Sequence, residues 1–254
     1  MDLRRGPWWG DGVRRSILVM LLALLLGGCT IEVVPSSGRP PSGDGPVPTA
    51  PVATNEQVDT TVDAQPGATD TETRADDERG AVNVVNTFWQ GWFREQGRRY
   101  VPPRVAGGYT GRNGPSCAGE PSVPGNAYYC PPGNFLAWDE NLMRAGYNQI
   151  GDAWVYLVIA HEWGHAIQAQ LPRRAVDQAV ELQADCLAGA ALQGSADQGR
   201  LRIEPGDAEE IQQTLEAVAD DYPWTDQSSH GDAQQRYGAF QTGVSQGVDG
   251  CLGR

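Results

Sequence analysis

Lysine is missing from this chain of 254 residues, because all 19 of its basic residues are arginine. The absence excludes chemistry that needs a lysine amine, including Schiff-base catalysis, pyridoxal phosphate enzymes and the P-loop of nucleotide-binding proteins. Histidine is almost as scarce, with three residues in the whole sequence. Any catalysis or metal binding by histidine must therefore use His161, His165 and His230.

Positive charge and long apolar runs are also in short supply. The 19 arginines stand against 32 acidic residues, and the net charge of −13 excludes a nucleic-acid partner, which would need a basic surface. Ile17–Leu26 is an apolar run of ten residues, whereas a helix that crosses a bilayer needs about 20. No two cysteines are separated by two residues, so zinc held by a Cys-x2-Cys pair is not expected.

Residues 1–28 have the pattern of a lipoprotein signal peptide. Four arginines precede the apolar run, and Leu26-Gly27-Gly28-Cys29 resembles a bacterial lipobox, whose cysteine is acylated. We predict export to the bacterial cell envelope and an extracytoplasmic, membrane-anchored lipoprotein that is lipidated at Cys29. An ordinary signal peptide, twin-arginine export through Arg14-Arg15 and a start near Val13 are the alternatives.

Residues 29–79 lack apolar periodicity. Runs such as PSSGRPP at residues 35–41 and TDTET at residues 69–73 cannot bury enough apolar surface to offset the entropy of ordering. The composition predicts a disordered linker between the lipidated cysteine and a folded domain.

Residues 80–254 are long enough for one domain. Apolar spacing predicts helices over residues 81–96, 153–171, 174–192, 207–220 and 232–244, with Asp152 as the N-cap of the second. Two short runs, Ala127–Cys130 and Asn134–Trp138, flank Pro-Pro-Gly and predict a β-hairpin. The fold class expected is α+β, mainly helical with a small sheet, preceded by the disordered tether.

A candidate metal site lies in the second predicted helix. His161-Glu162-Trp163-Gly164-His165 is an H-E-x-x-H sequence that follows eight apolar residues. Histidines four residues apart lie on one helical face, so both can bind one metal ion, and Glu162 lies beside them to polarise a metal-bound water. Two buried histidines with ordinary hydrogen bonds are the alternative, which the apolar surroundings disfavour. The motif predicts one zinc ion per chain.

A third protein ligand is expected because catalytic zinc usually takes three and leaves one position for water. Glu181 and Asp185 share one face of the next predicted helix. We predict that Glu181 binds zinc, while Asp185 accepts a hydrogen bond from the outer nitrogen of a ligand histidine. The alternative reverses these roles, with Asp185 as the ligand and Glu181 as its support.

Three segments in this order resemble the putative neutral zinc metallopeptidase (YpfJ-type) family, a group with the HExxH Glu-zincin pattern. They are residues 158–168 (VIAHEWGHAIQ), residues 181–186 (ELQADC) and the His-x5-Arg element of His230 and Arg236. The resemblance covers roughly residue 80 to the C-terminus, and Tyr128–Pro131 is similar to the family's aromatic-Cys-Pro segment. Asp232 departs from the small hydroxyl residue that is commoner there, which affects only a helix cap.

The resemblance implies a zincin-like metallopeptidase domain over residues 80–254, with Glu181 as the zinc ligand. It also implies hydrolysis of a peptide bond by a zinc-activated water. Glu162 would take the proton of that water and pass it to the leaving amine. His230 would donate to the oxyanion, and Arg236 would orient it or hold a nearby carboxylate.

Apart from Cys29, four cysteines are left, and they allow three disulfide pairings. Cys117 and Cys130 bracket a loop rich in glycine and proline before the hairpin. We favour the pairs Cys117–Cys130 and Cys186–Cys251, which fit an oxidising compartment outside the cytoplasm.

The leading hypothesis is therefore an exported, membrane-anchored zinc metallopeptidase that acts on a peptide or protein substrate in the cell envelope. Two alternatives are a non-catalytic binding or assembly lipoprotein stabilised by zinc, and a zinc amidase that acts on cell-wall peptides. The presence of Glu162 favours an enzyme, because a structural zinc site has no use for that carboxylate.

The Cys29→Ala substitution should release the mature protein from membranes. An acidic domain is repelled by anionic lipid, so the lipid on Cys29 would be its only attachment. Cell fractionation and metabolic labelling with a fatty acid measure both effects. Wild-type protein that takes up no label would contradict the lipidation.

Overall fold

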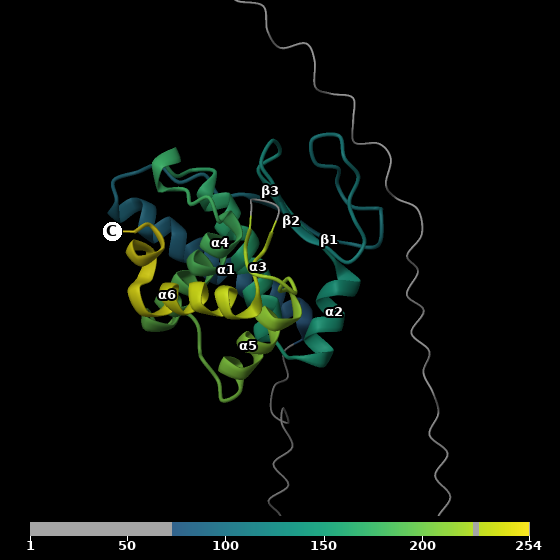
Figure 1. Cartoon of the computed structure of the whole chain (residues 1–254). Coiled ribbons are helices and arrows are strands. Elements are labelled where there is room, and N and C mark those ends of the chain that lie inside the picture. Colours follow the sequence, from purple (N-terminus) through teal and green to yellow (C-terminus); the bar gives the residue numbers. More distant parts are fainter. Residues whose placement is uncertain (1–72, 226–228, 254) are drawn as a thin grey trace, which may run out of the picture. The chain divides into compact units, whose positions relative to one another are not determined.

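The computed structural model describes residues 73–225 and 229–253 (Figure 1). The predicted signal peptide, Cys29 and the linker up to residue 72 lie outside these described residues. Within the described part of the chain, no helix has both the length and the apolar character that a membrane span requires.

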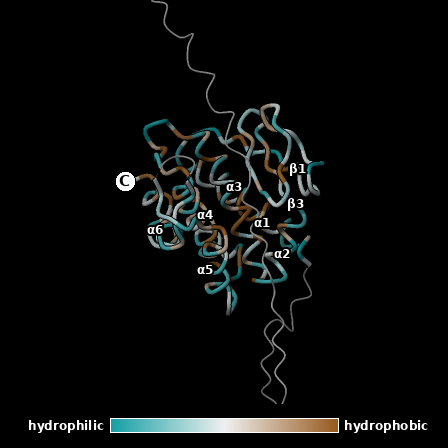
Figure 2. Tube along the Cα trace, turned by 45° about the vertical axis from the view of Figure 1, so that its right-hand side comes forward, coloured by the Kyte–Doolittle hydropathy of each residue, from teal (hydrophilic) through white to brown (hydrophobic). Residues whose placement is uncertain are grey.

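Helix α3 (Ala153–Gln168) forms the centre of the domain. Twelve of its sixteen residues are buried, as expected for a helix with apolar residues on every side. The helices that contact it are α1 (Arg74–Glu95), α2 (Glu140–Gln149), α4 (Val180–Asp197) and α5 (Asp207–Ala217). Figure 2 shows hydrophobic segments gathered around α1, α3 and α4, with hydrophilic segments outside.

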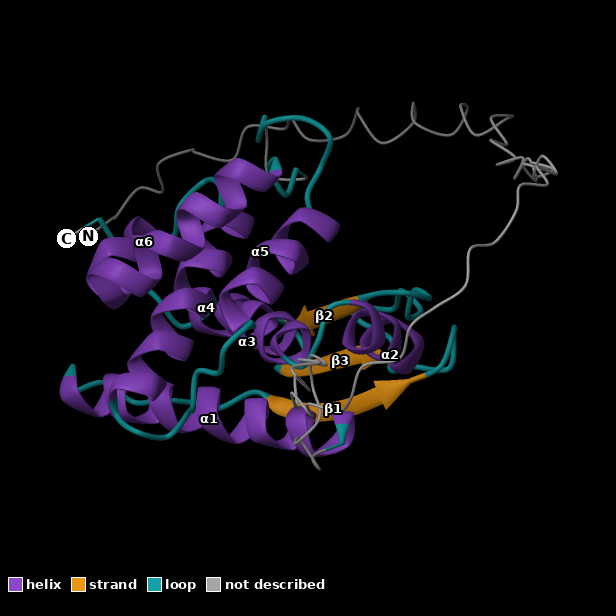
Figure 3. Ribbon diagram, turned by 90° about the horizontal axis from the view of Figure 1, so that it is seen from below, coloured by secondary structure: helices purple, strands orange, loops and turns teal. Residues whose placement is uncertain are grey.

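Three strands form the sheet in the order β1-β3-β2 (Figure 3). The antiparallel pair β2 (Ala127–Cys130) and β3 (Phe135–Asp139) is the predicted hairpin. Strand β1 (Arg104–Tyr109), which the sequence analysis missed, pairs with β3 in parallel. Gly107 and Gly108 interrupt the alternation of apolar and polar residues that would indicate a strand. The partner strand β3 also lies about 30 residues later in the chain. The predicted α+β class, mainly helical with a small sheet, is confirmed.

Helix α1 begins at Arg74, so residues 74–79 are helical and the predicted linker end at residue 79 is wrong. Thr73 and Asp76 form a capping box, in which each side chain accepts a hydrogen bond from the other residue's backbone N–H. The first turns carry one apolar residue, Ala75, so apolar periodicity could not reveal this start.

Helix α2 was also missed by the sequence analysis. It follows β3 without a loop, and Asp139, the last residue of that strand, caps it by accepting a hydrogen bond of 2.8 Å from the Asn141 backbone N–H. The helix therefore starts where the pattern of the hairpin ends. Sequence punctuation by glycine or proline, which marked the other elements, is absent at this junction.

The remaining helices agree with prediction in number and differ at their ends. Helix α3 ends at Gln168, and α4 begins at Val180 after a short 3-10 turn, Arg173–Ala175, which follows Pro172. The Asp152 side chain makes no capping hydrogen bond. Instead, the Glu210 carboxylate of α5 accepts a hydrogen bond of 3.2 Å from the Ala153 backbone N–H. The N-cap position is therefore the predicted Asp152, while a carboxylate of another helix supplies the acceptor.

Helix α6 (Ala233–Cys251) packs along α4 and continues past the predicted end at residue 244, with a kink at Gly247. Asp232 caps it through a capping box with Gln235, so the departure at this position leaves the cap intact. The two helices approach closely at Gly243, where a Cβ atom would lie 1.9 Å from the Cys186 carbonyl oxygen. Only glycine fits there.

Both disulfides have the favoured pairing. Cys117–Cys130 joins the loop after β1 to the end of β2. Cys186–Cys251 joins α4 to the C-terminal end of α6. The second bond fixes the end of the chain against the helix that carries Glu181 and Asp185.

Candidate metal centre

Three potential ligands meet between α3 and α4. The Glu181 Oε2 atom lies 3.2 Å from His161 Nε2 and 3.4 Å from His165 Nε2. Their ligand atoms all lie within 4.8 Å of one another, the spacing of donors around one metal ion. Gly164, between the two histidines, permits this meeting, because a Cβ atom there would lie 2.9 Å from the Ala184 carbonyl oxygen of α4.

The chemistry of this donor set fits zinc. Two imidazole nitrogens and one carboxylate oxygen are the ligands found in many catalytic zinc sites. The side chains of His161, His165 and Glu181 are 12%, 21% and 18% exposed, so the site is sheltered and still open on one side. The structure thus brings together the three residues that the sequence analysis predicted as zinc ligands.

Asp185 lies on the outer side of His161. Its Oδ1 atom is 2.8 Å from His161 Nδ1, the ring nitrogen that faces away from Glu181. Asp185 is fully buried, and Arg236 of α6 donates to both of its oxygens at 2.8 Å. This is the predicted supporting role. The alternative in which Asp185 binds the metal does not fit, because its carboxylate is already occupied by these donors.

The electrostatics of the pocket favour positive charge at the histidines. Burial by itself lowers the pKa of His161, but the Asp185 carboxylate and the hydrogen bonds to Asp185 and Glu181 outweigh it and raise that pKa to about 10. Burial by itself raises the pKa of Glu181, but the hydrogen bonds to both histidines have the larger effect and hold that pKa well below its usual range. The negative charge that raises the pKa of His161 also attracts a metal cation, which would replace the proton on Nε2.

Glu162 and the histidines line one cavity of about 840 Å³. Glu162 is 9% exposed and lies next to His161 on α3. The walls away from the histidines and carboxylates are mainly apolar, and they come from β2, α2, α3 and α5. They include Tyr128, Tyr129, Leu142, Trp154, Leu157, Val158, Leu215 and Val218.

His230 lines the same cavity, as predicted, on the loop before α6. Its side chain is 50% exposed, and Asp220 holds it in two ways. The Asp220 carboxylate accepts a hydrogen bond of 2.7 Å from the His230 backbone N–H and lies 3.4 Å from its Nδ1 atom. The sequence analysis did not predict Asp220, which lies ten residues earlier in an irregular loop where spacing carries no signal.

Arg236 also lines the cavity, and its guanidinium is buried on Asp185. Its Nη1 atom donates to the Val218 carbonyl oxygen at 2.6 Å. Of the two roles predicted for Arg236, holding a nearby carboxylate is the one that these contacts display. We therefore regard it as a positioning residue and not as a catalytic one.

His165 has an outer partner that the sequence analysis missed. Its Nδ1 atom is 2.9 Å from the Gln168 Oε1 atom, three residues further along α3. Gln168 is buried. The i to i+3 spacing on a helix was the available signal, but a glutamine near a helix end is more often at the surface.

Comparison with known families identifies the chain. The family model described as "Putative neutral zinc metallopeptidase" matches residues 45–251. This range covers most of the sequence, and the chain belongs to that family. Neither a curated protein nor a solved structure matches it.

The Arg236→Met substitution should lower the free energy of unfolding of the metal-free protein by about 3–5 kcal/mol, because the buried Asp185 carboxylate loses its guanidinium partner and both of that group's hydrogen bonds. Urea denaturation measures the loss. The matched control is Arg202→Met, whose side chain is 85% exposed and pairs with Glu204; it should cost less than about 1 kcal/mol. Equal losses in the two variants would contradict the buried pair's importance.

Proposed function

We propose that this protein is an exported zinc metallopeptidase that is anchored to the cell envelope through Cys29 and holds one zinc ion per chain. The observation that carries the proposal is the meeting of three ligand atoms, from His161, His165 and Glu181, beside Glu162 in one open cavity. Membership in a zinc metallopeptidase family supports the same reaction class.

The three ligands would hold the ion. When bound, zinc lowers the pKa of a coordinated water toward 7 and polarises a carbonyl group. Glu162 lies in the same cavity and is the carboxylate placed to accept a proton and deliver it to the leaving amine. Asp185 and Arg236 keep the His161 ring oriented, so that its Nε2 atom faces the metal position.

His230 would stabilise the negative charge that develops on the carbonyl oxygen. His230 lines the cavity, and its Nδ1 atom lies 3.4 Å from the Asp220 carboxylate. For Nε2 to donate to the oxyanion while Nδ1 donates to Asp220, the ring must carry a proton on both nitrogens. A donor that is held before the reaction needs no reorganisation in the transition state.

The apolar walls of the cavity suit peptide side chains on either side of the scissile bond. A non-catalytic zinc-stabilised lipoprotein would need neither Glu162 nor a cavity of about 840 Å³ beside the ligands. A zinc amidase that acts on cell-wall peptides would use the same residues. Family membership favours a peptide or protein substrate, and the proposed anchor at Cys29 would place that substrate in the cell envelope.

The Glu162→Gln substitution should abolish hydrolysis, because the amide cannot accept the proton of the attacking water. Zinc should stay bound, because residue 162 is not one of the three proposed ligands. His161→Ala should instead lose the metal as well. Elemental analysis and turnover of a fluorogenic peptide library measure the two properties.

The control for these variants is Glu209→Gln, an exposed glutamate on α5, which should retain both zinc and activity. Zinc that persists when both His161 and His165 are replaced would refute the site. Peptide cleavage at the wild-type rate by Glu162→Gln would refute the mechanism.

The His230→Ala substitution should lower kcat and kcat/KM together by about 10²–10³, the range for a single oxyanion donor, with zinc retained. Asp220→Asn should give a smaller loss, while the exposed neighbour Asp221 should tolerate the same change. Turnover near that of the wild type for His230→Ala would return this histidine to the role of a surface residue. Loss of zinc would make it a ligand and displace Glu181.

A further inference from the structure

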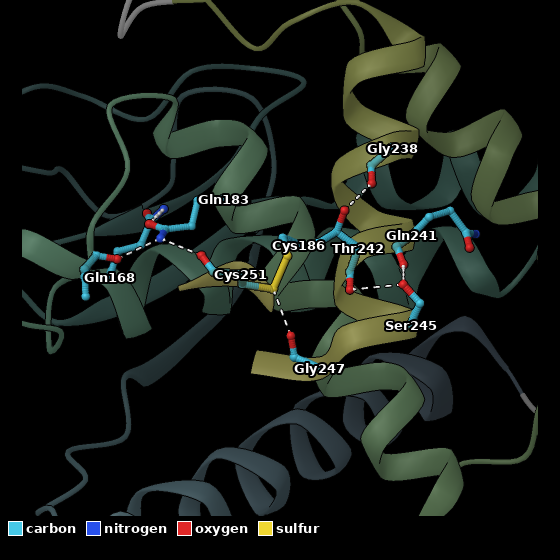
Figure 4. The surroundings of a disulfide bond; sticks show 10 residues. Gln168, Gln183, Cys186, Gly238, Gln241, Thr242, Ser245, Gly247 and Cys251 are labelled. Carbon is cyan, nitrogen blue, oxygen red and sulfur yellow. Dashed lines mark hydrogen bonds between the residues drawn. A yellow bond between two sulfur atoms is a disulfide. The ribbon is translucent and has the colours of Figure 1, made fainter. Parts of the chain in front are cut away.

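Two buried glutamines, Gln168 and Gln183, lie near the Cys186–Cys251 disulfide (Figure 4), and the first of them contacts His165. Gln168 is on α3 and Gln183 is on α4, and they are 8% and 6% exposed. Neither residue has a part in the proposed chemistry. A buried amide must nevertheless satisfy its donors and acceptors, so the hydrogen bonds around the pair determine which way each amide points.

The orientation of Gln183 is fixed by backbone groups. Its Nε2 atom donates to the carbonyl oxygens of Ala175 at 2.8 Å and Cys251 at 3.1 Å. Its Oε1 atom accepts from the Asp177 backbone N–H at 3.1 Å. A flipped amide would set an oxygen against two carbonyls and an NH2 group against an N–H, so this orientation is the only one that satisfies all partners.

Gln183 in turn orients Gln168. The Gln168 Nε2 atom donates to Gln183 Oε1 at 3.2 Å and to the Val180 carbonyl oxygen at 2.7 Å. Both of its amide hydrogens are therefore used on the α4 side. Its Oε1 atom is left facing His165 Nδ1 at 2.9 Å, where it can only accept.

His165 must then carry a proton on Nδ1, which makes Nε2 the nitrogen that binds a metal ion once any proton on it is released. That atom is the one that faces Glu181. Metal binding requires this tautomer and this ring orientation. The two glutamines thus hold His165 in the form that a metal ligand needs, by neutral amides, whereas His161 is held by the Asp185 carboxylate.

We propose that Gln168 is the positioning residue for His165 and that Gln183 fixes it from α4. The proposal rests on the zinc site of the proposed function. The last group in this series of hydrogen bonds is the Cys251 carbonyl, which the disulfide to Cys186 keeps beside α4. Helix α6 therefore supports the metal site at both of its ends, through Arg236 in its first turn and through the Cys251 carbonyl, which holds Gln183.

The test is the zinc affinity of the full-length chain, measured by competition with a chromophoric chelator. Gln168→Leu removes the acceptor at nearly constant volume and should weaken zinc binding about 10–100-fold, the usual effect of losing an outer hydrogen-bond partner. Gln183→Leu should weaken it by less, since Gln168 keeps its bond to Val180. Gln168→Glu restores an acceptor oxygen for His165 but sets its second oxygen against the Val180 carbonyl and Gln183 Oε1, so it should recover only part of the affinity lost by Gln168→Leu.

The matched control is Gln170→Leu. Gln170 lies just beyond the same helix and also bonds to backbone groups, at Ala166 and Val101, but touches no histidine. The Gln170→Leu variant should bind zinc with wild-type affinity. The absorption spectrum of the cobalt-substituted protein should change for Gln168→Leu and stay unchanged for Gln170→Leu, whereas a loss of stability by itself would not alter ligand geometry.

Zinc affinity of Gln168→Leu within twofold of the wild type would overturn the proposal, as would equal losses in Gln168→Leu and Gln170→Leu. A wild-type chain that binds zinc but cleaves no peptide would contradict the proposed function, and the affinities would still decide the role of Gln168. A wild-type chain that binds no zinc would overturn both.

Discussion

Helices α3 and α4 touch at Gly164 and Ala184, and this contact sets the distance between the groups that could bind a metal. Two histidines on α3 supply one side of the site, and a glutamate on α4 supplies the other. Any side chain at position 164 would push the helices apart, and the separation of Glu181 from both imidazoles would grow with it. A glycine inside a helix costs about 1 kcal/mol of helix stability relative to alanine. The packing of α3 against the surrounding helices offsets this cost.

The polar groups of the site are buried, so each needs a partner that is itself held. Asp185 and Arg236 neutralise one another behind His161. Gln168 and Gln183 supply uncharged partners behind His165. The Asp185 carboxylate, which contacts His161, is balanced by the Arg236 guanidinium. Gln168, which contacts His165, is a neutral amide and adds no charge. This arrangement avoids an uncompensated buried charge, which would be far more costly than an unpaired amide.

Helix α6 completes the site although it supplies no predicted ligand. Its first half carries Arg236, and its end carries Cys251, whose carbonyl accepts from Gln183 and whose sulfur joins Cys186. Gly243 lets this helix lie against the backbone of α4. The outer partners of both histidines are thereby anchored to one helix pair, so a change in the packing of α4 and α6 would reach both imidazoles.

The sequence by itself determined the chemistry at the centre. The H-E-x-x-H spacing sets two histidines on one helical face, the apolar run before it predicts a buried helix, and helical spacing places Glu181 and Asp185 together. Such local patterns obey the geometry of a single helix, which is why they could be read without a structure. The same is true of the hairpin and of the family resemblance, which the family model bears out.

Tertiary structure decided the rest. It separated the roles of Glu181 and Asp185, because only the approach of α3 and α4 shows which ring nitrogen each carboxylate faces. It also revealed β1, whose pairing partner is distant in sequence, and α2, which begins without punctuation. Asp220 and Gln183 act through contacts between elements, and side chains that meet across such contacts leave no periodic trace in one sequence. Local periodicity encodes a helix and its face, whereas the partner of that face is fixed only when the whole chain packs.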